Sequence, residues 1–292
     1  MKYRHQYHAG NFADVHKHVT LLALITALRR KEKGFAYFET HAGRGLYELK
    51  GAGSEAEGGA DRFTSGTHDS AELRALAHLI AQVRAERRDP RAYPGSPLIA
   101  ARELRAQDHG IVSEVQVGEA RALASTLRAW PAMRVEEGDG FERLRAWLPP
   151  RERRGLIFID PPYEDSHVEL GRVTQAVTDA LQRFETGVIA AWFPIKDERD
   201  SHSWTQAFAR TVRRETLLSE LWLYPRDSRV ALNGSGMLIV NPPYLLAERM
   251  AGWLPELHAQ LDIQHTGGSG VRWLTRAANA PAAAGSAARR SR

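Results

Sequence analysis

Cysteine is absent from this sequence of 292 residues. Its absence excludes disulfide bonds, thiolate metal sites and cysteine nucleophiles, and it is typical of proteins kept in a reducing compartment. Long apolar runs are also lacking, since none approaches the roughly 18 residues of a membrane-spanning helix. The first residues, Met1-Lys2-Tyr3-Arg4-His5, do not contain the apolar core of a signal peptide. We therefore expect a cytoplasmic protein without a membrane partner.

The sequence also lacks a strong excess of one charge. Lys and Arg number 40 and Asp and Glu 35, which gives a formal net charge of +5. Residues 277–292 contain three arginines and no acid, so the rest of the chain has 37 basic and 35 acidic residues. Charge alone is therefore weak evidence for a polyanionic partner. Because residues 277–292 are low in complexity and rich in Ala, Gly, Ser and Arg, we predict a disordered tail there.

A histidine motif for metal binding is missing as well. His16 and His18 are two residues apart in a predicted helix, where they would face different directions, and no H-E-x-x-H motif occurs. We therefore predict no metal site. His18 and His41 are better interpreted as polar contacts near a cofactor.

Strand-like and helix-like segments alternate through most of the chain. A helix is predicted over about residues 13–33, and helices also separate most of the later strands. Short connections between alternating strands and helices favour a mostly parallel sheet covered on both faces. We predict an α/β fold with a Rossmann-like sheet of seven strands, the last two forming a hairpin at one edge. The predicted strands cover residues 35–38, 110–114, 133–135, 156–159, 188–193, 216–224 and 237–240.

Residues 46–110 interrupt this alternation and are predicted to form a small helical insertion. Their first part, 51–67, is rich in glycine, serine and acids and predicts a mobile loop. Ser96 is placed to cap a helix that has Pro97 in its first turn. The remaining α/β domain comprises residues 1–45 and 111–276, of which 1–34 form an N-terminal arm and helix.

Acidic residues end four successive predicted strands: Glu39, Glu114, Asp139 and Asp160. The carboxyl ends of strands in a doubly wound sheet face one crevice, where ligands bind. Glu114, after the second strand, is placed to accept hydrogen bonds from two ribose hydroxyls. Asp139, which lies between two glycines, could meet the amino group of a cofactor adenine.

A tight loop with Gly43 and Gly45 follows the first of these strands, and its glycines allow the backbone to approach a ligand closely. This loop could pass under the amino-acid portion of a cofactor. Because the sequence has no G-x-G-x-x-G, the pattern predicts S-adenosylmethionine rather than a nicotinamide dinucleotide.

The fourth strand ends in Asp160-Pro161-Pro162-Tyr163. The Asp160 carboxylate and the Pro161 carbonyl could accept both hydrogens of the exocyclic amine of an adenine. Such acceptors would make this nitrogen a better nucleophile and stabilise the positive charge that develops on it. Asp160 could afterwards receive the released proton, and Tyr163 could stack on a base flipped out of its helix.

A similar stretch, Asn241-Pro242-Pro243-Tyr244, follows the seventh predicted strand. The glycine loop belongs to the first strand, and the catalytic loop is expected at the end of the fourth. Strand order therefore favours Asp160 as the catalytic residue and a structural role for Asn241.

Several motifs of this chain together resemble those of the RlmJ family of bacterial 23S rRNA adenine-N6 methyltransferases. The resemblance covers the chain from Tyr3 to about the last predicted helix. The motifs that carry it are Tyr3-Arg4-His5, His8-Ala9-Gly10-Asn11, Ala13-Asp14-Val15, Lys17-His18, Thr40-His41-Ala42-Gly43, Tyr93-Pro94-Gly95-Ser96-Pro97-Leu98-Ile99-Ala100, Asp139-Gly140 and Asp160-Pro161-Pro162-Tyr163.

The resemblance implies a Rossmann-like methyltransferase that modifies one adenine of 23S rRNA. We expect a monomer whose partner is 23S rRNA, either naked or in an early precursor particle. The resemblance places Tyr3 and Lys17 near the active site and the RNA. The positions that it implies for contact with S-adenosylmethionine are His18, His41, Ser96, Glu114, Asp139, Gly140 and Asp160. The glycine loop adds Gly43 to these candidates.

Two other functions remain open from the sequence. A DNA adenine-N6 methyltransferase would share the catalytic loop, although sequence-specific readers of DNA usually need a larger recognition domain than residues 46–110 offer. A non-catalytic RNA-binding protein with a relic pocket is the other alternative, and the intact Asp160 and glycine loops argue against it.

Overall fold

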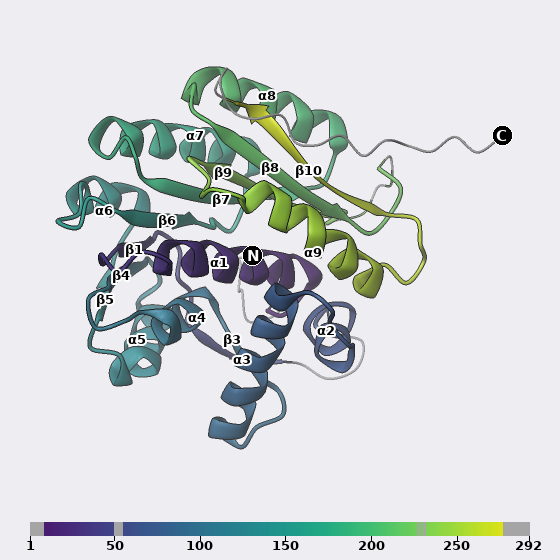
Figure 1. Ribbon diagram of the computed structural model, residues 1–292, viewed down its shortest axis with the longest axis horizontal. Helices are drawn as coiled ribbons and strands as arrows, with labels where there is room; N and C mark the ends of the chain where they lie inside the picture. Colours follow the sequence, from purple (N-terminus) through teal and green to yellow (C-terminus); the bar gives the residue numbers. More distant parts are fainter. Residues whose placement is uncertain (1–8, 50–54, 227, 229, 231, 277–292) are drawn as a thin grey trace.

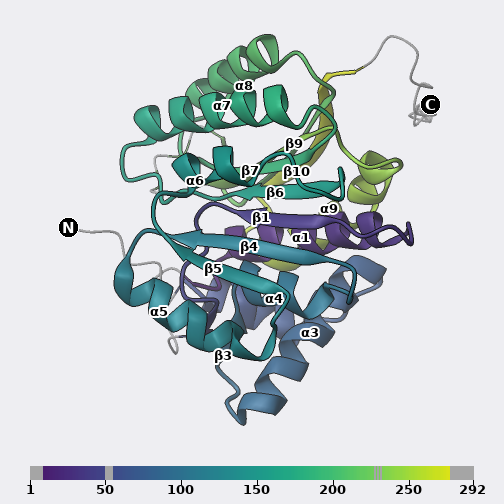
Figure 2. The same cartoon turned by 90° about the vertical axis from the view of Figure 1, so that its left-hand side faces the viewer.

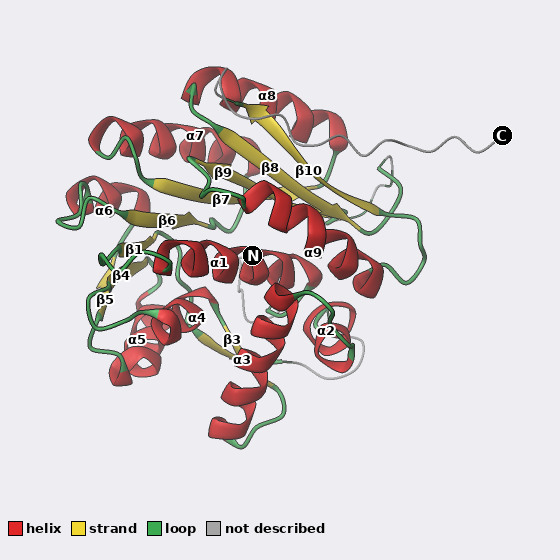
Figure 3. Ribbon diagram, in the orientation of Figure 1, coloured by secondary structure: helices red, strands yellow, loops and turns green. Residues whose placement is uncertain are grey.

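The structure is a computed structural model that describes residues 9–49, 55–226, 228, 230 and 232–276 (Figure 1). Tyr3 and the predicted tail of residues 277–292 lie outside the described residues. Helices cover both faces of one large sheet, which confirms the predicted α/β fold (Figure 3). No helix in the described part of the chain is long and apolar enough to cross a membrane.

The main sheet has eight strands in the spatial order β10-β8-β9-β7-β6-β1-β4-β5. The strands from β7 to β5 are parallel, whereas β8, β9 and β10 pair antiparallel. The first five strands of this sheet in chain order therefore have the order 3-2-1-4-5 of a doubly wound fold, with its switch point between β1 and β6. Their bounds are β1 Ala36–Glu39, β4 His109–Glu114, β5 Met133–Glu137, β6 Gly155–Ile159, β7 Val188–Ile195, β8 Thr216–Trp222, β9 Gly234–Val240 and β10 Gly268–Thr275.

The helices form two layers around this sheet (Figure 2). On one face, α1 packs against α3, α4 and α9, and on the other face α6, α7 and α8 lie side by side. The first helix, α1, is almost completely buried because it is covered by the sheet on one side and by helices on the others. The bounds are α1 Phe12–Arg29, α3 Ala71–Arg87, α4 Ser96–Glu103, α5 Val117–Thr126, α6 Gly140–Trp147, α7 Ser166–Arg183, α8 Glu198–Val212 and α9 Leu246–Leu261.

The segment predicted as an insertion is more ordered than its composition suggests. Strands β2 (Leu46–Glu48) and β3 (Ala92–Pro94) form a separate two-stranded sheet. A π-helix, Glu57–Asp61, leads into α2 (Arg62–Ser65), within the region that we predicted to be a loop. That prediction was wrong for these residues, because Phe63 is fully buried among the helices around α1. Residues 50–54 lie outside the described residues.

The predicted number of strands in the main sheet was one too low. The hairpin of β8 and β9 does not lie at the edge of this sheet, where we predicted it. Strand β9 inserts between β7 and β8, and β10 pairs along the outer side of β8. The sequence of β10 contains two glycines and an arginine, and all its residues are half-buried. Its formation depends on the exposed edge of β8 rather than on a hydrophobic pattern of its own.

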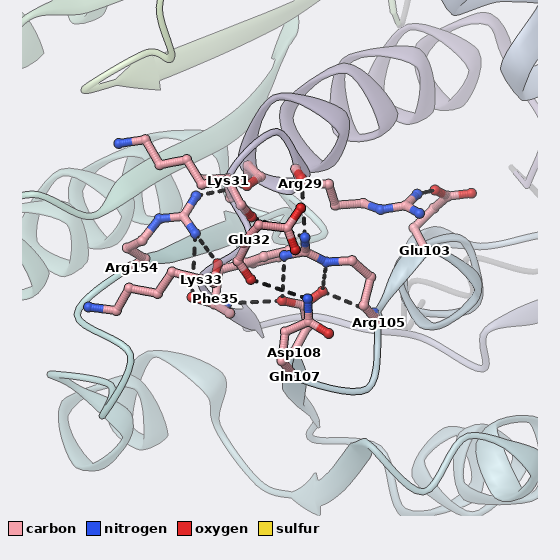
Figure 4. Close-up of polar contacts among 12 residues, drawn as sticks. Arg29, Lys31, Glu32, Lys33, Phe35, Glu103, Arg105, Gln107, Asp108 and Arg154 are labelled. Atoms are coloured by element: carbon pink, nitrogen blue, oxygen red, sulfur yellow. Dashed lines mark hydrogen bonds and ion pairs between the residues drawn. The ribbon is translucent and has the colours of Figure 1, made fainter.

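Helix α1 ends at Arg29 instead of the predicted Lys33. Figure 4 shows that side chains from distant segments donate hydrogen bonds to the backbone carbonyls at its end. Arg154 Nη2 donates to the Leu28 carbonyl at 2.7 Å, and Arg105 Nη1 donates to the carbonyls of Arg29 and Lys31 at 3.1 and 3.0 Å. These bonds satisfy carbonyls that otherwise need the next helical turn.

Asp108 connects this turn to the start of β1. Its carboxylate accepts from the Phe35 amide at 3.0 Å and from the Arg105 amide and Nε at 2.9 and 2.8 Å. Burial would raise the pKa of Asp108, but its hydrogen bonds with Arg105 and Phe35 hold that pKa below its ordinary value. The charged carboxylate therefore stabilises the turn between α1 and β1.

We expect Asp108→Asn to lower the free energy of unfolding at pH 7 by about 3 kcal/mol, because the substitution removes a buried charge that accepts hydrogen bonds from the half-buried Arg105 and from the Phe35 amide. A lowered carboxyl pKa stabilises the fold above the unfolded value of about 3.9, and this contribution is lost as the pH falls through the folded pKa. Urea titrations between pH 7 and pH 3 should therefore show the two proteins converging at low pH. Glu32→Gln, an exposed change in the same turn, should stay within about 0.5 kcal/mol, and an equal loss there would contradict this role of Asp108.

Candidate active site

A cavity of about 350 Å³ opens at the carboxyl ends of β1, β4 and β6. This position is the switch point of the sheet, where the strand order reverses and ligands bind in folds of this type. Side chains from α1, from the loops after these strands and from β7 meet in it. The lining residues important here are Asp14, Lys17, His18, His41, Gly43, Ser96, Glu114, Asp160, Pro161, Pro162 and Trp192.

The glycine loop and the acid of β4 form one unit in this cavity. Gly43 has φ +58°, and a Cβ there would lie 2.2 Å from the Tyr47 hydroxyl, so the turn requires glycine. The Gly43 amide donates to Glu114 Oε2 at 2.9 Å, and the Gln116 amide donates to Oε1 at 2.8 Å. Burial raises the pKa of Glu114. The carboxylate is therefore held in place at the cavity wall.

The two histidines predicted to lie near a cofactor both line the cavity. His18 Nδ1 is 2.9 Å from the Tyr93 hydroxyl, and His41 Nδ1 is 2.8 Å from the Thr40 hydroxyl. Burial lowers the pKa of His41 to about 4, so its ring is neutral at pH 7. A neutral imidazole can offer one donor and one acceptor to a ligand.

Ser96 lies at the cavity but does not cap α4 as we predicted. Gly95 is the N-cap residue, and the Ser96 hydroxyl instead donates to Glu39 Oε1. Glu39 also accepts from the Tyr37 hydroxyl at 2.8 Å and is fully buried. Burial raises the pKa of Glu39 to about 8. This strand-end acid therefore lies below the cavity floor, mostly protonated at neutral pH.

Asp139 and Gly140 are not among the residues that line the cavity. Asp139 caps α6 by accepting from the Phe141 amide at 2.9 Å, and it forms an ion pair with Arg172 at 2.6 Å. A Cβ on Gly140 would lie 1.9 Å from the Thr40 carbonyl oxygen, so glycine allows α6 to approach β1. Of the four strand-end acids, Glu114 and Asp160 face the cavity.

Asp160 is held by a buried ion-pair network. Lys17 Nζ lies 2.6 Å from Asp160 Oδ2 and 2.8 Å from Asp14 Oδ1. The same ammonium lies 4.5 Å from the ring centroid of Trp192. Burial alone would lower the pKa of Lys17, but the two carboxylates raise it above its ordinary value, so the ammonium stays charged. Lys17, which we predicted near the RNA, therefore lies inside the cavity against the candidate catalytic carboxylate.

Trp192, rather than Tyr163, places an aromatic ring in the cavity wall beside Asp160. Tyr163 is 3% exposed, and its hydroxyl donates to the Trp192 carbonyl. The Trp192 indole nitrogen donates to the Ser235 hydroxyl at 3.0 Å, which fixes the ring. The prediction that Tyr163 offers its ring to a base is therefore not met in this structure.

The sequence interpretation missed Asp14 and Trp192 as site residues. The spacing of Asp14 and Lys17, three residues apart in a helix, indicates a pair on one helical face. Trp192 carried no such signal, because an aromatic residue inside an apolar strand is typical of a core position.

The Asn241 loop lies at the opposite end of the strands from the cavity. Strand β9 runs antiparallel to β7 and pairs Val240 with Ile189, near the amino end of β7. Asn241 Nδ2 donates to the carbonyls of Glu185 and Gly187 at 2.8 and 2.9 Å. The strand direction therefore separates this loop from the cavity and gives Asn241 a structural role.

Among the described residues, no cluster of His, Cys, Asp and Glu is arranged to hold a metal ion.

The buried Glu39 carboxyl should make stability depend on pH. Its folded pKa of about 8 exceeds the unfolded value of 4.5, so folding retains a proton between these values. Stability therefore decreases as the pH rises through this window. We expect the melting temperature of Glu39→Gln, measured by differential scanning calorimetry, to rise relative to that of the unsubstituted protein as the pH increases from 5 to 8. A constant difference across this range would show that Glu39 is not protonated in the folded chain.

Comparison with known proteins agrees with this geometry. The family model described as Ribosomal RNA large subunit methyltransferase D, RlmJ, matches residues 32–275. The Ribosomal RNA large subunit methyltransferase J of Escherichia coli (strain K12) is 37% identical over 278 residues, which cover 94% of this chain and 99% of that protein. The protein of the same name from Haemophilus influenzae is 35% identical over 279 residues, with coverage of 94% and 99%.

The fold is shared with a solved structure as well. Protein LPL1258 from Legionella pneumophila superposes with a TM-score of 0.81 at 32% sequence identity, covering 91% of this chain and 98% of that one. The two relatives cover 94% of this chain, and the family model covers the sheet and the loops at the cavity but not α1. The chain therefore belongs to the RlmJ family of ribosomal RNA large subunit methyltransferases.

Proposed function

We propose that this chain is a 23S rRNA methyltransferase that transfers a methyl group from S-adenosylmethionine to N6 of one adenine. Family membership supports the reaction class and the ribosomal RNA substrate. The observation that carries the assignment is the position of Asp160-Pro161-Pro162, which lines the same cavity as the glycine loop and Glu114. An acceptor for an amine and a site for a nucleoside cofactor are thus adjacent.

The cavity fits the proposed cofactor in size and in chemistry. Its volume is about 350 Å³, its glycine loop allows close backbone approach, and Glu114 presents a carboxylate where ribose hydroxyls need acceptors. Bound S-adenosylmethionine supplies an electrophilic methyl group on a sulfonium. The residues that we propose to hold it are His18, His41, Gly43, Ser96, Glu114 and Asp160.

Asp160 and Pro161 would activate the acceptor nitrogen. The lone pair of an exocyclic adenine nitrogen is delocalised into the ring, so it is a weak nucleophile. A carboxylate and a carbonyl that accept its two hydrogens favour a tetrahedral nitrogen and stabilise the positive charge that forms on it. Asp160 then takes the released proton, directly or through water.

The target base must leave its stack to reach this cavity. Trp192 presents the fixed aromatic face in the wall, and Tyr163 supports it from behind through its bond to the Trp192 carbonyl. We therefore assign base stacking to Trp192 and a supporting role to Tyr163. Tyr3 belongs to the N-terminal arm, which we propose to contact the RNA.

The wider organisation follows from these roles. We propose a catalytic domain of residues 1–45 and 111–276 and an insertion of residues 46–110 that helps to dock the RNA. The protein would act as a monomer in the cytoplasm, on 23S rRNA that is naked or in an early precursor particle.

Asp160→Ala should lower the rate of methyl transfer at least about 100-fold, because the side chain that accepts a hydrogen of the reacting nitrogen is lost. Asn241→Ala is the matched control in the second proline loop. It loses two hydrogen bonds and should cost about 2 kcal/mol of stability while methyl transfer stays within about threefold. Transfer of radioactive methyl groups to rRNA, together with thermal unfolding, measures both effects. An inactive Asn241→Ala protein beside an active Asp160→Ala protein would refute the assignment.

The substrate can be tested with protein-free 23S rRNA and duplex DNA in parallel. We expect labelled methyl groups to enter the rRNA and to appear as N6-methyladenine at one position after nuclease digestion. Transfer only to DNA would refute the rRNA assignment. Transfer to neither, by a protein that still binds S-adenosylhomocysteine, would indicate a non-catalytic relic.

A further inference from the structure

Lys17 places a charged ammonium group at Asp160 Oδ2, the oxygen that the proposed reaction needs as a hydrogen-bond acceptor. Its Nζ lies 2.6 Å from Asp160 Oδ2 and 4.5 Å from the ring centroid of Trp192. Its side chain is 5% exposed, so the charge is shielded from solvent. The ammonium therefore occupies the space between the carboxylate and the aromatic wall.

The Lys17 ammonium resembles the methyl-accepting nitrogen as it is just after methyl transfer. At that moment the acceptor nitrogen is cationic, carries a methyl carbon and donates hydrogens. Lys17 Nζ is likewise a cationic nitrogen that carries a carbon, donates to Asp160 and lies over an aromatic ring. The site thus accommodates such a cation well, but Lys17 and a target adenine cannot bind Asp160 Oδ2 in the same way together.

Asp14 offers Lys17 a second partner on its own helix. Asp14 Oδ1 lies 2.8 Å from Lys17 Nζ, and Asp14 Oδ2 accepts from the Gly10 amide at 2.8 Å. Asp14 is 3% exposed, and Gly10 is fixed because its carbonyl accepts from the Ala60 amide at 2.7 Å. Asp14 is therefore a stationary anchor, whereas the four-carbon stem of Lys17 can change rotamer.

We propose that Asp14 is a positioning residue that retains the Lys17 ammonium when the target adenine replaces it on Asp160. This inference rests on the proposed function, because it assumes that the adenine amine binds the Asp160 oxygen that Lys17 releases. A buried charge that loses one partner needs the other. With Asp14 present, Lys17 keeps an ion pair after it releases Asp160.

Asp14 also limits the effect of the Lys17 charge on the reaction. A lysine cation beside the acceptor nitrogen opposes the positive charge that develops there. An ion pair with Asp14 neutralises this lysine and holds it on the α1 side of the cavity. Without Asp14, Asp160 is the remaining ion-pair partner of Lys17 among the described residues, so Lys17 would compete with the base.

A double-mutant cycle tests whether Asp14 acts through Lys17. It compares the unsubstituted protein with Asp14→Asn, Lys17→Met and the double variant. Asparagine keeps an acceptor for the Gly10 amide and removes the charge that holds Lys17. The measurements are kcat and KM with 23S rRNA and the Kd of adenosine at saturating S-adenosylhomocysteine, which fills the cofactor site.

We expect Asp14→Asn alone to raise the adenosine Kd and the KM for rRNA about tenfold or more, in line with the loss of a charge-assisted bond. In the Lys17→Met background the same substitution should change both values less than about twofold, because the competing ammonium is gone. An equal effect in both backgrounds, or no effect in either, would overturn the proposal.

Two controls separate this result from a folding defect and from failure of the proposed function. The Kd of S-adenosylhomocysteine should stay within about threefold in all four proteins, and Asp14→Glu, which keeps the charge, should retain most of the adenosine affinity. Loss of adenosine affinity in Asp14→Glu equal to that in Asp14→Asn would contradict a charge-based role. The adenosine cycle can be interpreted even if the unsubstituted protein transfers no methyl group to rRNA, an outcome that would refute the proposed function alone.

Discussion

The buried ion pairs of Lys17 connect the first helix of this protein to the end of its central strand. Removing either carboxylate would leave an ammonium in a cavity with few other partners, which is costly at such low exposure. The network therefore joins α1 to the carboxyl end of β6 at the cavity. Because α1 also packs against the insertion and α9, residues of the first helix, the sheet and the insertion meet around this point.

The direction of the strands decides which of two similar loops can take part in chemistry. Parallel strands β1, β4 and β6 place their carboxyl ends at one edge, where Glu114 and Asp160 meet. The antiparallel β9 places Asn241 at the opposite edge, where its amide satisfies two carbonyls. A proline-rich loop with a polar residue can therefore be catalytic or structural, depending only on the direction of the strand before it.

Burial limits the number of charges at the site. The raised pKa of Glu39 and the lowered pKa of His41 favour neutral forms at pH 7. Arg44 and Glu119 line the cavity as an ion pair of their own. The other charged groups in its lining are the carboxylates of Asp14, Glu114 and Asp160 and the ammonium of Lys17. This distribution suits a reaction in which a positive charge moves from sulfur to nitrogen.

Local sequence determined the alternation of strands and helices that favours a parallel sheet, and the position of Asp160 after the fourth strand, because apolar periodicity and proline restrict the backbone over short distances. The motifs also indicated the glycine loop, Glu114, His18 and His41, which all line the cavity. Tertiary structure alone decided that Glu39 is covered by Ser96, that Asp139 pairs with Arg172 and that Trp192 replaces Tyr163 in the wall. It also decided that β10 covers β8 and that Lys17 contacts Asp160 across 143 positions of the chain. These features depend on which surfaces meet after folding, and no short stretch of sequence contains both partners.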